Sequence, residues 1–194
     1  MKKILILFAG ILLVISVSCT RTLMFFSGGH MPRYETPESI TSYALKAGLR
    51  TDNIYVFRDT SAFKAAIQSI GKLPDIDFYD RHGFKMKVKN PDDCHKTVDK
   101  IIDSLSLQQP YPLDSTSRLS DLTSELCNLD GSPWNMDQSI AADFTVAIYW
   151  ATFTGNTNKK SPRVWEEKLY EKGKTLGIRI LKVNFDFQEF WESD

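Results

Sequence analysis

The sequence contains little cysteine and has no excess of charge of either sign. Cysteine occurs three times in 194 residues, and 24 lysine and arginine residues are balanced by 24 aspartate and glutamate residues. A balanced chain lacks the strongly basic character of proteins that bind nucleic acid, so we expect no nucleic-acid partner. No two cysteines lie within three residues of each other, so the chain also lacks a Cys-X-X-Cys redox pair.

Several motifs for catalysis or cofactor binding are also missing. The Ser27-Gly28-Gly29 segment is too short for a phosphate-binding glycine loop. His30 and His82 have no visible nucleophile and acid with which to complete a hydrolytic triad. Residues 92–95 contain two aspartates, a cysteine and a histidine, but neighbouring helical residues point in different directions and helix capping explains the acids. We therefore expect no metal, no cofactor and no catalytic residue, and we do not expect an enzyme.

One apolar run approaches the length of a membrane span, and it lies at the start of the chain. Residues 4–17 are apolar apart from one glycine and one serine, follow Lys2 and Lys3, and end before Ser18-Cys19. The run is shorter than the roughly 18 to 20 apolar residues of a membrane-spanning helix. This pattern is typical of a secretory signal peptide, which we assign to residues 1–18.

The segment Ser16-Val17-Ser18-Cys19 resembles the lipobox of bacterial lipoproteins, with Ser16 at the position of the usual leucine. The resemblance implies that Cys19 becomes the N-terminus and carries a lipid. We therefore expect a lipoprotein of the cell envelope that is attached to the membrane and faces the periplasm. The alternative is an ordinary signal peptide that ends near a cysteine.

The remaining chain, residues 19–194, is long enough for one domain with a sizeable core. Cys94 and Cys127 stay open to two interpretations. They could form a disulfide in an oxidising compartment, or they could be two separate buried thiols that act as small apolar residues. The spacing of the two cysteines does not decide between these interpretations.

Residues 22–105 show alternating strand and helix signals. The segments 22–26, 53–57, 75–79 and 84–88 predict strands, and the last two are joined by a tight turn. Capping residues Thr36, Asp59 and Asn90 begin three stretches with helical spacing of apolar residues. The predicted order is β-α-β-α-β-β-α.

The second half of the chain begins with a weak signal and ends with a strong one. Residues 106–142 are rich in serine, aspartate, proline and glutamine without a sustained period, so we expect a connector that wraps the domain. Residues 143–194 contain a nearly continuous apolar run at 144–153, a helix that opens at Ser161-Pro162, and a strand at 178–187. This βαβ unit and the alternation before it predict an α/β fold with a sheet covered on both faces. Trp150 and Trp165 are expected in the core, and Trp134 at a surface contact.

Two segments resemble thioredoxin-like thiol-disulfide oxidoreductases. The run from Trp150 to Thr157, W-A-T-F-T-G-N-T, is similar to the family pattern W-A-[ST]-W-C-G-P-C, and residues 183–186, V-N-F-D, are similar to the family's V-N-V-D strand. Residues 73–83, L-P-D-I-D-F-Y-D-R-H-G, resemble the family's hairpin, which begins with a cis-proline. The resemblance implies a thioredoxin-like mixed sheet flanked by helices, with Pro74 as the candidate cis-proline.

This sequence departs from the family in order and in chemistry. The segment that resembles the active site follows the proline hairpin, whereas it precedes the hairpin in the family, so the C-terminal βαβ unit is either permuted or appended. Thr154, Gly155, Asn156 and Thr157 occupy the active-site turn without a cysteine, and an N-terminal unit would place Gly28 to Met31 there, also without one. A threonine hydroxyl cannot replace the thiolate in disulfide exchange.

The resemblance therefore implies a redox-inactive, thioredoxin-like lipoprotein that binds a peptide or protein partner. The alternative is a thiol-disulfide oxidoreductase that uses Cys94 and Cys127.

Overall fold

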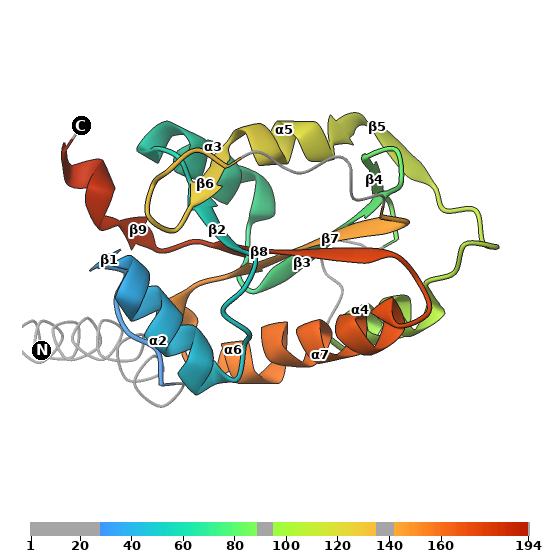
Figure 1. Cartoon of the computed structure of the whole chain (residues 1–194), viewed down its shortest axis with the longest axis horizontal. Helices are drawn as coiled ribbons and strands as arrows, with labels where there is room; N and C mark the ends of the chain where they lie inside the picture. Colours follow the sequence, from blue (N-terminus) through green and yellow to red (C-terminus); the bar gives the residue numbers. More distant parts are fainter. Residues whose placement is uncertain (1–27, 89–94, 135–141, 194) are drawn as a thin grey trace, which may run out of the picture.

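The computed structural model describes residues 28–88, 95–134 and 142–193, and its centre is a seven-stranded mixed sheet (Figure 1). The strand order across the sheet is β5-β4-β3-β7-β8-β2-β6. The strand bounds are β2 Ile54–Phe57, β3 Asp75–Asp80, β4 Phe84–Met86, β5 Leu113–Arg118, β6 Leu126–Asn128, β7 Phe144–Trp150 and β8 Ile178–Asn184.

Parallel and antiparallel pairings occupy different parts of the sheet. β2, β8 and β7 run parallel to one another, whereas β3 is antiparallel to β7, β4 to β3 and β5 to β4. On the other edge, β6 is antiparallel to β2. The predicted α/β class with a mixed sheet is confirmed.

Helices cover both faces of this sheet. Figure 1 shows α3 and α5 on one face, and α2, α4, α6 and α7 on the other. Their bounds are α2 Pro37–Ala47, α3 Thr60–Ile70, α4 His95–Ser104, α5 Leu119–Ser124, α6 Thr157–Lys160 and α7 Pro162–Gly173. Both predicted caps in the described region are present, since the side chains of Thr36 and Asp59 accept hydrogen bonds from the backbone of Ser39 and Ala62.

The core is divided between the two faces by the alternation of side chains along each strand. Ile76, Phe78 and Ile148 pack under α4 and α7 together with Trp165. Phe57, Phe63 and Phe185 form an aromatic cluster on the face of α3. Every residue of β7 is buried, which explains why the sequence of this strand is a continuous apolar run. Trp150 and Trp165 lie in the core as expected.

The C-terminal βαβ unit occupies the middle of the sheet. β7 and β8 lie between β3 and β2, both of which come from the first half of the chain. The unit is therefore not appended at an edge. The two segments that resemble thioredoxins come to lie side by side as a result, because β7 pairs directly with β3.

The described part of the expected connector, residues 106–134 and 142, contains three regular elements. β5, α5 and β6 lie within it, and the two strands form opposite edges of the sheet. The chain thus crosses from one edge to the other within this segment. β5 is largely exposed and polar, so it lacks the apolar alternation that a half-buried strand shows. The strand predicted at 22–26 lies outside the described residues.

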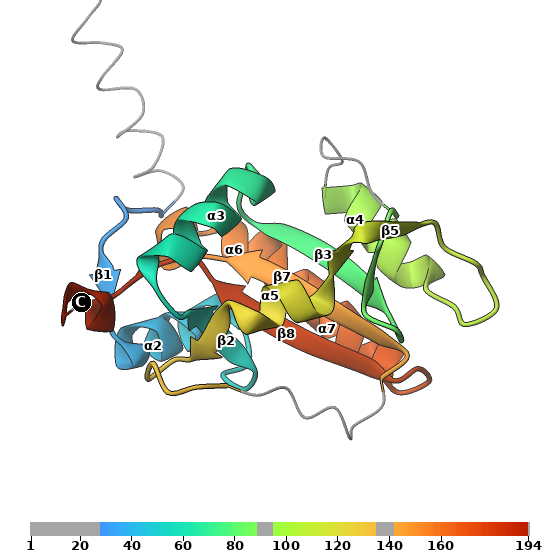
Figure 2. The same cartoon turned by 90° about the horizontal axis from the view of Figure 1, so that it is seen from above.

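A second, two-stranded sheet lies at one end of the molecule. β1, Tyr34–Glu35, runs parallel to β9, Phe187–Gln188, and the short 3-10 helix η2 follows at Glu189–Ser193. Figure 2 places β1 and the C-terminus at the end of the molecule opposite β5. Residues 28–36 thus cross the end of the large sheet at which β7 and β8 finish.

Candidate functional site

The candidate cis-proline lies beside the end of β7. Asp75 pairs with Tyr149 in the antiparallel ladder, so Pro74 lies one position further along, next to the final residue of β7, Trp150. The Leu73–Pro74 peptide bond is cis, as the resemblance implies, and Pro74 is buried. The hairpin segment and the turn after β7 therefore meet at one end of the sheet.

The turn after β7 has a defined hydrogen-bonded structure. A 3-10 helix, η1 Thr152–Thr154, is followed by Gly155 and by α6, whose first residue is Thr157. The hydroxyl of Thr154 lies 2.8 Å from the carbonyl oxygen of Ala151 and 3.0 Å from Oδ1 of Asn158. Asn156 is exposed and makes no side-chain capping bond to α6. Thr154 and Thr157 thus lie within an ordered turn.

The two glycine segments that the sequence singles out touch each other. Gly155 has φ +60°, and a Cβ atom on it would lie 2.4 Å from the carbonyl carbon of Gly28 and from the nitrogen of Gly29. The backbone N–H of His30 donates to the carbonyl oxygen of Phe153 at 3.2 Å. Only glycine permits this approach of two backbones. The N-terminal segment therefore lies directly against the turn.

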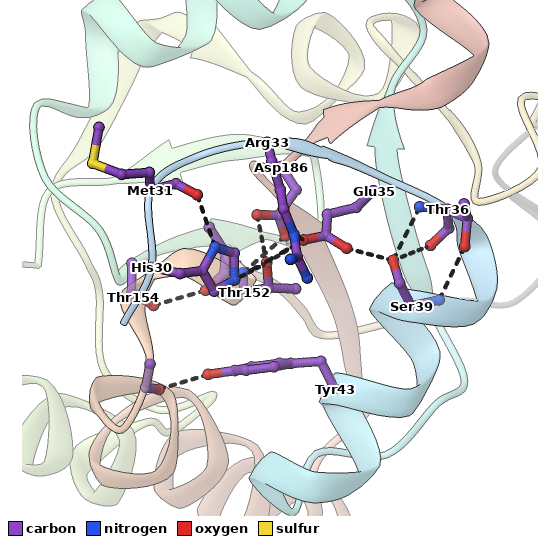
Figure 3. A network of polar contacts seen from close by, with 12 residues as sticks. His30, Met31, Arg33, Glu35, Thr36, Ser39, Tyr43, Thr152, Thr154 and Asp186 are labelled. Carbon is purple, nitrogen blue, oxygen red and sulfur yellow. Dashed lines mark hydrogen bonds and ion pairs between the residues drawn. The ribbon is translucent and has the colours of Figure 1, made fainter. Parts of the chain in front are cut away.

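A polar network centred on Thr152 joins this segment to the ends of β7 and β8 (Figure 3). The hydroxyl of Thr152 lies 2.8 Å from Oδ1 of Asp186, and its backbone N–H donates to Oδ2 of the same carboxyl at 2.8 Å. Nε2 of His30 lies 3.3 Å from this hydroxyl, and Oε1 of Glu35 lies 3.4 Å from it. One buried threonine thus contacts an imidazole and two carboxyl groups.

The pKa values of Glu35 and Asp186 are shifted in opposite directions. Burial favours a higher pKa for Glu35, but hydrogen bonds from Ser39 and Arg33, at 2.6 and 2.7 Å, outweigh it and lower the pKa. Burial raises the pKa of Asp186, and the charge of Glu35 raises it further.

The hydrogen bonds of this network hold the N-terminal segment against the ends of β7 and β8. Thr152 is only 2% exposed and its hydroxyl is already bonded, so it is not presented as a nucleophile. Among the residues that the structure describes, no group of three or more His, Cys, Asp or Glu side chains is arranged to hold a metal ion. This end of the molecule has a turn held by hydrogen bonds and three half-buried apolar side chains, Leu73, Phe153 and Phe187.

Sequence reasoning missed the residues that fix the turn. Tyr43 donates its hydroxyl to the carbonyl oxygen of Gly155 at 2.7 Å, and Asn158 donates to the Tyr43 hydroxyl at 3.1 Å. Tyr43 lies on α2, and a half-buried tyrosine at helical spacing gives no sign of such a bond. Thr152 and Asp186 do lie inside the W-A-T-F and V-N-F-D segments, so the resemblance could have indicated them.

Of the three cysteines, the structure describes only Cys127. It lies in β6 as a buried free thiol, and burial, with the nearby charges of Asp130 and Asp59, raises its pKa to about 11. Cys19 and Cys94 lie outside the described residues. Trp134, expected at a surface contact, is half-buried and packs against the ring of Tyr55 with 4.0 Å between ring centroids.

Comparison with known proteins does not assign this chain to a family. No protein-family model, no curated protein and no solved structure matches the chain. Within the part of the chain that the structure describes, no helix is both long enough and apolar enough to cross a membrane.

The raised pKa of Asp186 predicts that the free energy of unfolding depends on pH, and the variant Asp186→Asn should remove this contribution. Because the folded-state pKa of Asp186 is raised, its protonation stabilises the protein below the unfolded pKa of about 3.9, and this stabilisation is lost as pH rises through the folded pKa. Asparagine stays neutral and retains an oxygen for the backbone N–H of Thr152. We expect the free energy of unfolding of Asp186→Asn, relative to the parent, to increase with rising pH.

Urea unfolding at several pH values measures this difference. Asp103→Asn is the matched control, because Asp103 is exposed on α4 and pairs with Lys168 at 2.8 Å. A difference between Asp186→Asn and the parent that stays constant from acidic to neutral pH would contradict the raised pKa.

Proposed function

We propose that this chain is a redox-inactive, thioredoxin-like lipoprotein of the cell envelope that binds a peptide or protein partner. The observation that carries the proposal is that cis-Pro74 lies beside Trp150, at the same end of the sheet as the Thr154–Thr157 turn. In thioredoxin-like proteins the corresponding cleft receives extended peptide, and the cleft does not require the cysteines. Because the peptide-binding cleft is inferred from the fold alone, it requires a direct test of binding.

Two features of the site support binding of an extended chain. Leu73, Phe153 and Phe187 are half-buried apolar side chains that pack on one core cluster, and such side chains provide contact area for a partner. The carbonyl oxygen of Phe153 already accepts a hydrogen bond from the backbone of His30. The turn thus forms a main-chain hydrogen bond with a segment that is not part of the sheet, which is how extended peptides are commonly bound.

The alternative, an oxidoreductase that uses Cys94 and Cys127, gains no support from Cys127. A nucleophilic thiolate requires a lowered pKa, whereas burial raises that of Cys127 to about 11. Thr154 and Thr157 contribute no sulfur to the turn. The arrangement therefore favours binding over exchange.

Binding is tested with an unfolded protein that has no free thiols. Fluorescently labelled, carboxymethylated α-lactalbumin is titrated with the detergent-solubilised full-length protein, and fluorescence anisotropy is measured. We expect saturable binding that weakens about tenfold or more in Phe153→Asp, a loss of about 1.4 kcal/mol. Asn156→Trp should weaken binding by obstruction, because Asn156 is exposed and contributes nothing to the core.

Ile67→Asp is the matched control for the apolar-to-acid change. Ile67 is 44% exposed on α3. Equal binding by the parent, Phe153→Asp and Asn156→Trp, or no saturable binding by the parent, would refute the proposed site.

Attachment to the membrane is predicted to depend on Cys19 alone. Replacement of Cys19 by serine removes the thiol that carries the lipid. We expect Cys19→Ser to move from the membrane fraction to the soluble fraction of fractionated cells. Cys127→Ser, which changes a buried thiol, should stay with the membrane. Retention of Cys19→Ser in the membrane would contradict the lipoprotein assignment.

A further inference from the structure

A cavity of about 550 Å³ lies on the sheet face that carries α3 and α5, and the proposed peptide site does not use it. Its walls come from α3, α5, β4 and β5, and its floor from β3 and β7. Figure 2 shows α3 and α5 lying over different parts of the sheet. Cavities of about 300 to 1,000 Å³ are the usual size of small-molecule sites.

The floor of the cavity carries a group of linked polar side chains. Asp77 and Tyr79 lie two residues apart on β3 and therefore face the same side of the sheet. Nζ of Lys85 donates to Oδ2 of Asp77 at 2.7 Å, and the hydroxyl of Tyr149 donates to the same oxygen at 3.2 Å. Asp77 is only 6% exposed. Both contacts converge on one carboxylate oxygen, so an incoming donor would use the other oxygen, Oδ1.

The Asp77 carboxylate is buried, whereas the side chain of its partner Lys85 is 36% exposed. Removing the charge of a carboxylate from water is costly, and an ion pair with a partly exposed lysine compensates this cost only in part. On the opposite face of the same strand, Ile76 and Phe78 are fully buried in an apolar cluster. Asp75, Asp77 and Tyr79 of β3 thus share the face with the cavity, whereas Asp80 at the end of the strand does not line it. Buried charge at a concave site is a feature of ligand-binding sites.

The lining of the cavity defines the kind of ligand. Five lining side chains are acidic and three are basic, so the surroundings favour a cation over an anion. The cavity also has an apolar wall, which consists of Ala62 and Ala66 of α3 and Leu122 of α5. Burial raises the pKa of Tyr79 and of Tyr149, with the charge of Asp77 adding to it, so both phenols stay neutral.

We propose that this cavity binds a small organic amine, with its ammonium group at Asp77 and its apolar group against α3 and α5. Lys85 is the internal cation that holds this position when no ligand is bound. A ligand amine competes with Lys85 for the carboxylate, so the two residues have opposite effects on affinity. Loss of the carboxylate weakens binding, and loss of the internal cation strengthens it.

Three probes with one apolar group and different heads test the proposal. 2-Phenylethylamine, 3-phenylpropionate and 2-phenylethanol are titrated into the detergent-solubilised full-length protein by isothermal calorimetry at neutral pH. We expect the amine to bind saturably, with a Kd about tenfold or more below that of the other two probes. A carboxylate probe that binds as tightly as the amine, or an amine that does not saturate, would overturn the proposal.

Variants then locate the site. Asp77→Asn should weaken amine binding about tenfold or more, whereas Lys85→Gln should tighten it. Asp103→Asn, which removes one acid from α4 on the other face of the sheet, should leave the affinity unchanged. If Asp77→Asn fails to fold, Ala66→Leu fills the cavity with a good helix former and should abolish binding of the amine. Equal effects of Asp77→Asn and Asp103→Asn, or undiminished binding by Ala66→Leu, would overturn the proposal.

Discussion

Replacement of Lys182 by methionine, with Glu166 kept, is expected to lower the free energy of unfolding by about 3 to 5 kcal/mol. Lys182 lies in the middle of β8 and is fully buried. Its ammonium nitrogen lies 2.5 Å from Oε1 of Glu166 and donates to the carbonyl oxygen of Arg50 at 2.8 Å. Methionine has a similar size and no charge, so the cost arises from the partners that remain.

Glu166 is the partner that makes the substitution costly. Its side chain is 2% exposed, and it would become a buried carboxylate without its ammonium partner. Oε2 still accepts the backbone N–H of Arg50 at 3.0 Å, which compensates only in part. The same residue, Arg50, stacks on the ring of Tyr170 with its guanidinium 3.7 Å from the centroid. The pair thus fixes the chain between α2 and β2 to α7.

Urea unfolding of single and double variants separates loss of the pair from loss of one charge. The double variant Lys182→Met with Glu166→Gln carries no buried charge, and the amide retains an acceptor for the N–H of Arg50. We expect it to recover at least half of the stability that Lys182→Met loses. Equal losses in the single and double variants would contradict the view that the uncompensated carboxylate is the main cost.

Lys182 also marks where sequence reasoning reaches its limit. The strand predicted at 178–187 corresponds to β8, which ends at Asn184, and Lys182 lies inside it. Its partner Glu166 lies on α7, and the two meet because the helix crosses over the sheet between two parallel strands. Periodicity predicts that the helix and the strand exist, but which polar residues face each other depends on their packing. The burial of the pair could not be read from the sequence.

Local sequence patterns also do not predict the order of the strands in the sheet. Each of the two halves shows a consistent strand and helix pattern, but nothing in the pattern predicts that β7 and β8 lie between β3 and β2. The candidate site depends on that arrangement, since His30 and Glu35 meet Thr152 and Asp186 only there. Motif likeness indicated Pro74 and the Thr154–Thr157 turn, whereas the residues that surround them come from distant parts of the chain.

The second large effect is expected at Gly155, where alanine should destabilise the protein by about 3 kcal/mol through backbone strain and overpacking. Gly155 has φ +60° and ψ −132°, a conformation that is open to glycine and costly for other residues. A Cβ atom would also lie 2.4 Å from the backbone of Gly28 and Gly29, which cannot move aside as a flexible side chain would.

Release of the N-terminal segment gives this variant a second, local signature. If residues 28–30 move away from the turn, the hydrogen bond from His30 to Phe153 breaks and the contacts of Glu35 with Thr152 weaken. The peptide bond after Arg33, which has a 68% exposed side chain, should then be cut faster by trypsin under native conditions. Urea unfolding measures the global effect, and the rate of cleavage after Arg33 measures the local one.

Gly71→Ala separates the clash from the strain. Gly71 also has positive φ, +71°, but a Cβ atom there meets nothing within 4 Å, and the residue lies at the end of α3. We expect Gly71→Ala to cost about 1 kcal/mol, from backbone strain alone, and to leave cleavage after Arg33 unchanged. If Gly155→Ala costs no more than Gly71→Ala, or leaves that cleavage rate unchanged, the N-terminal segment is not held against the turn as the structure shows it.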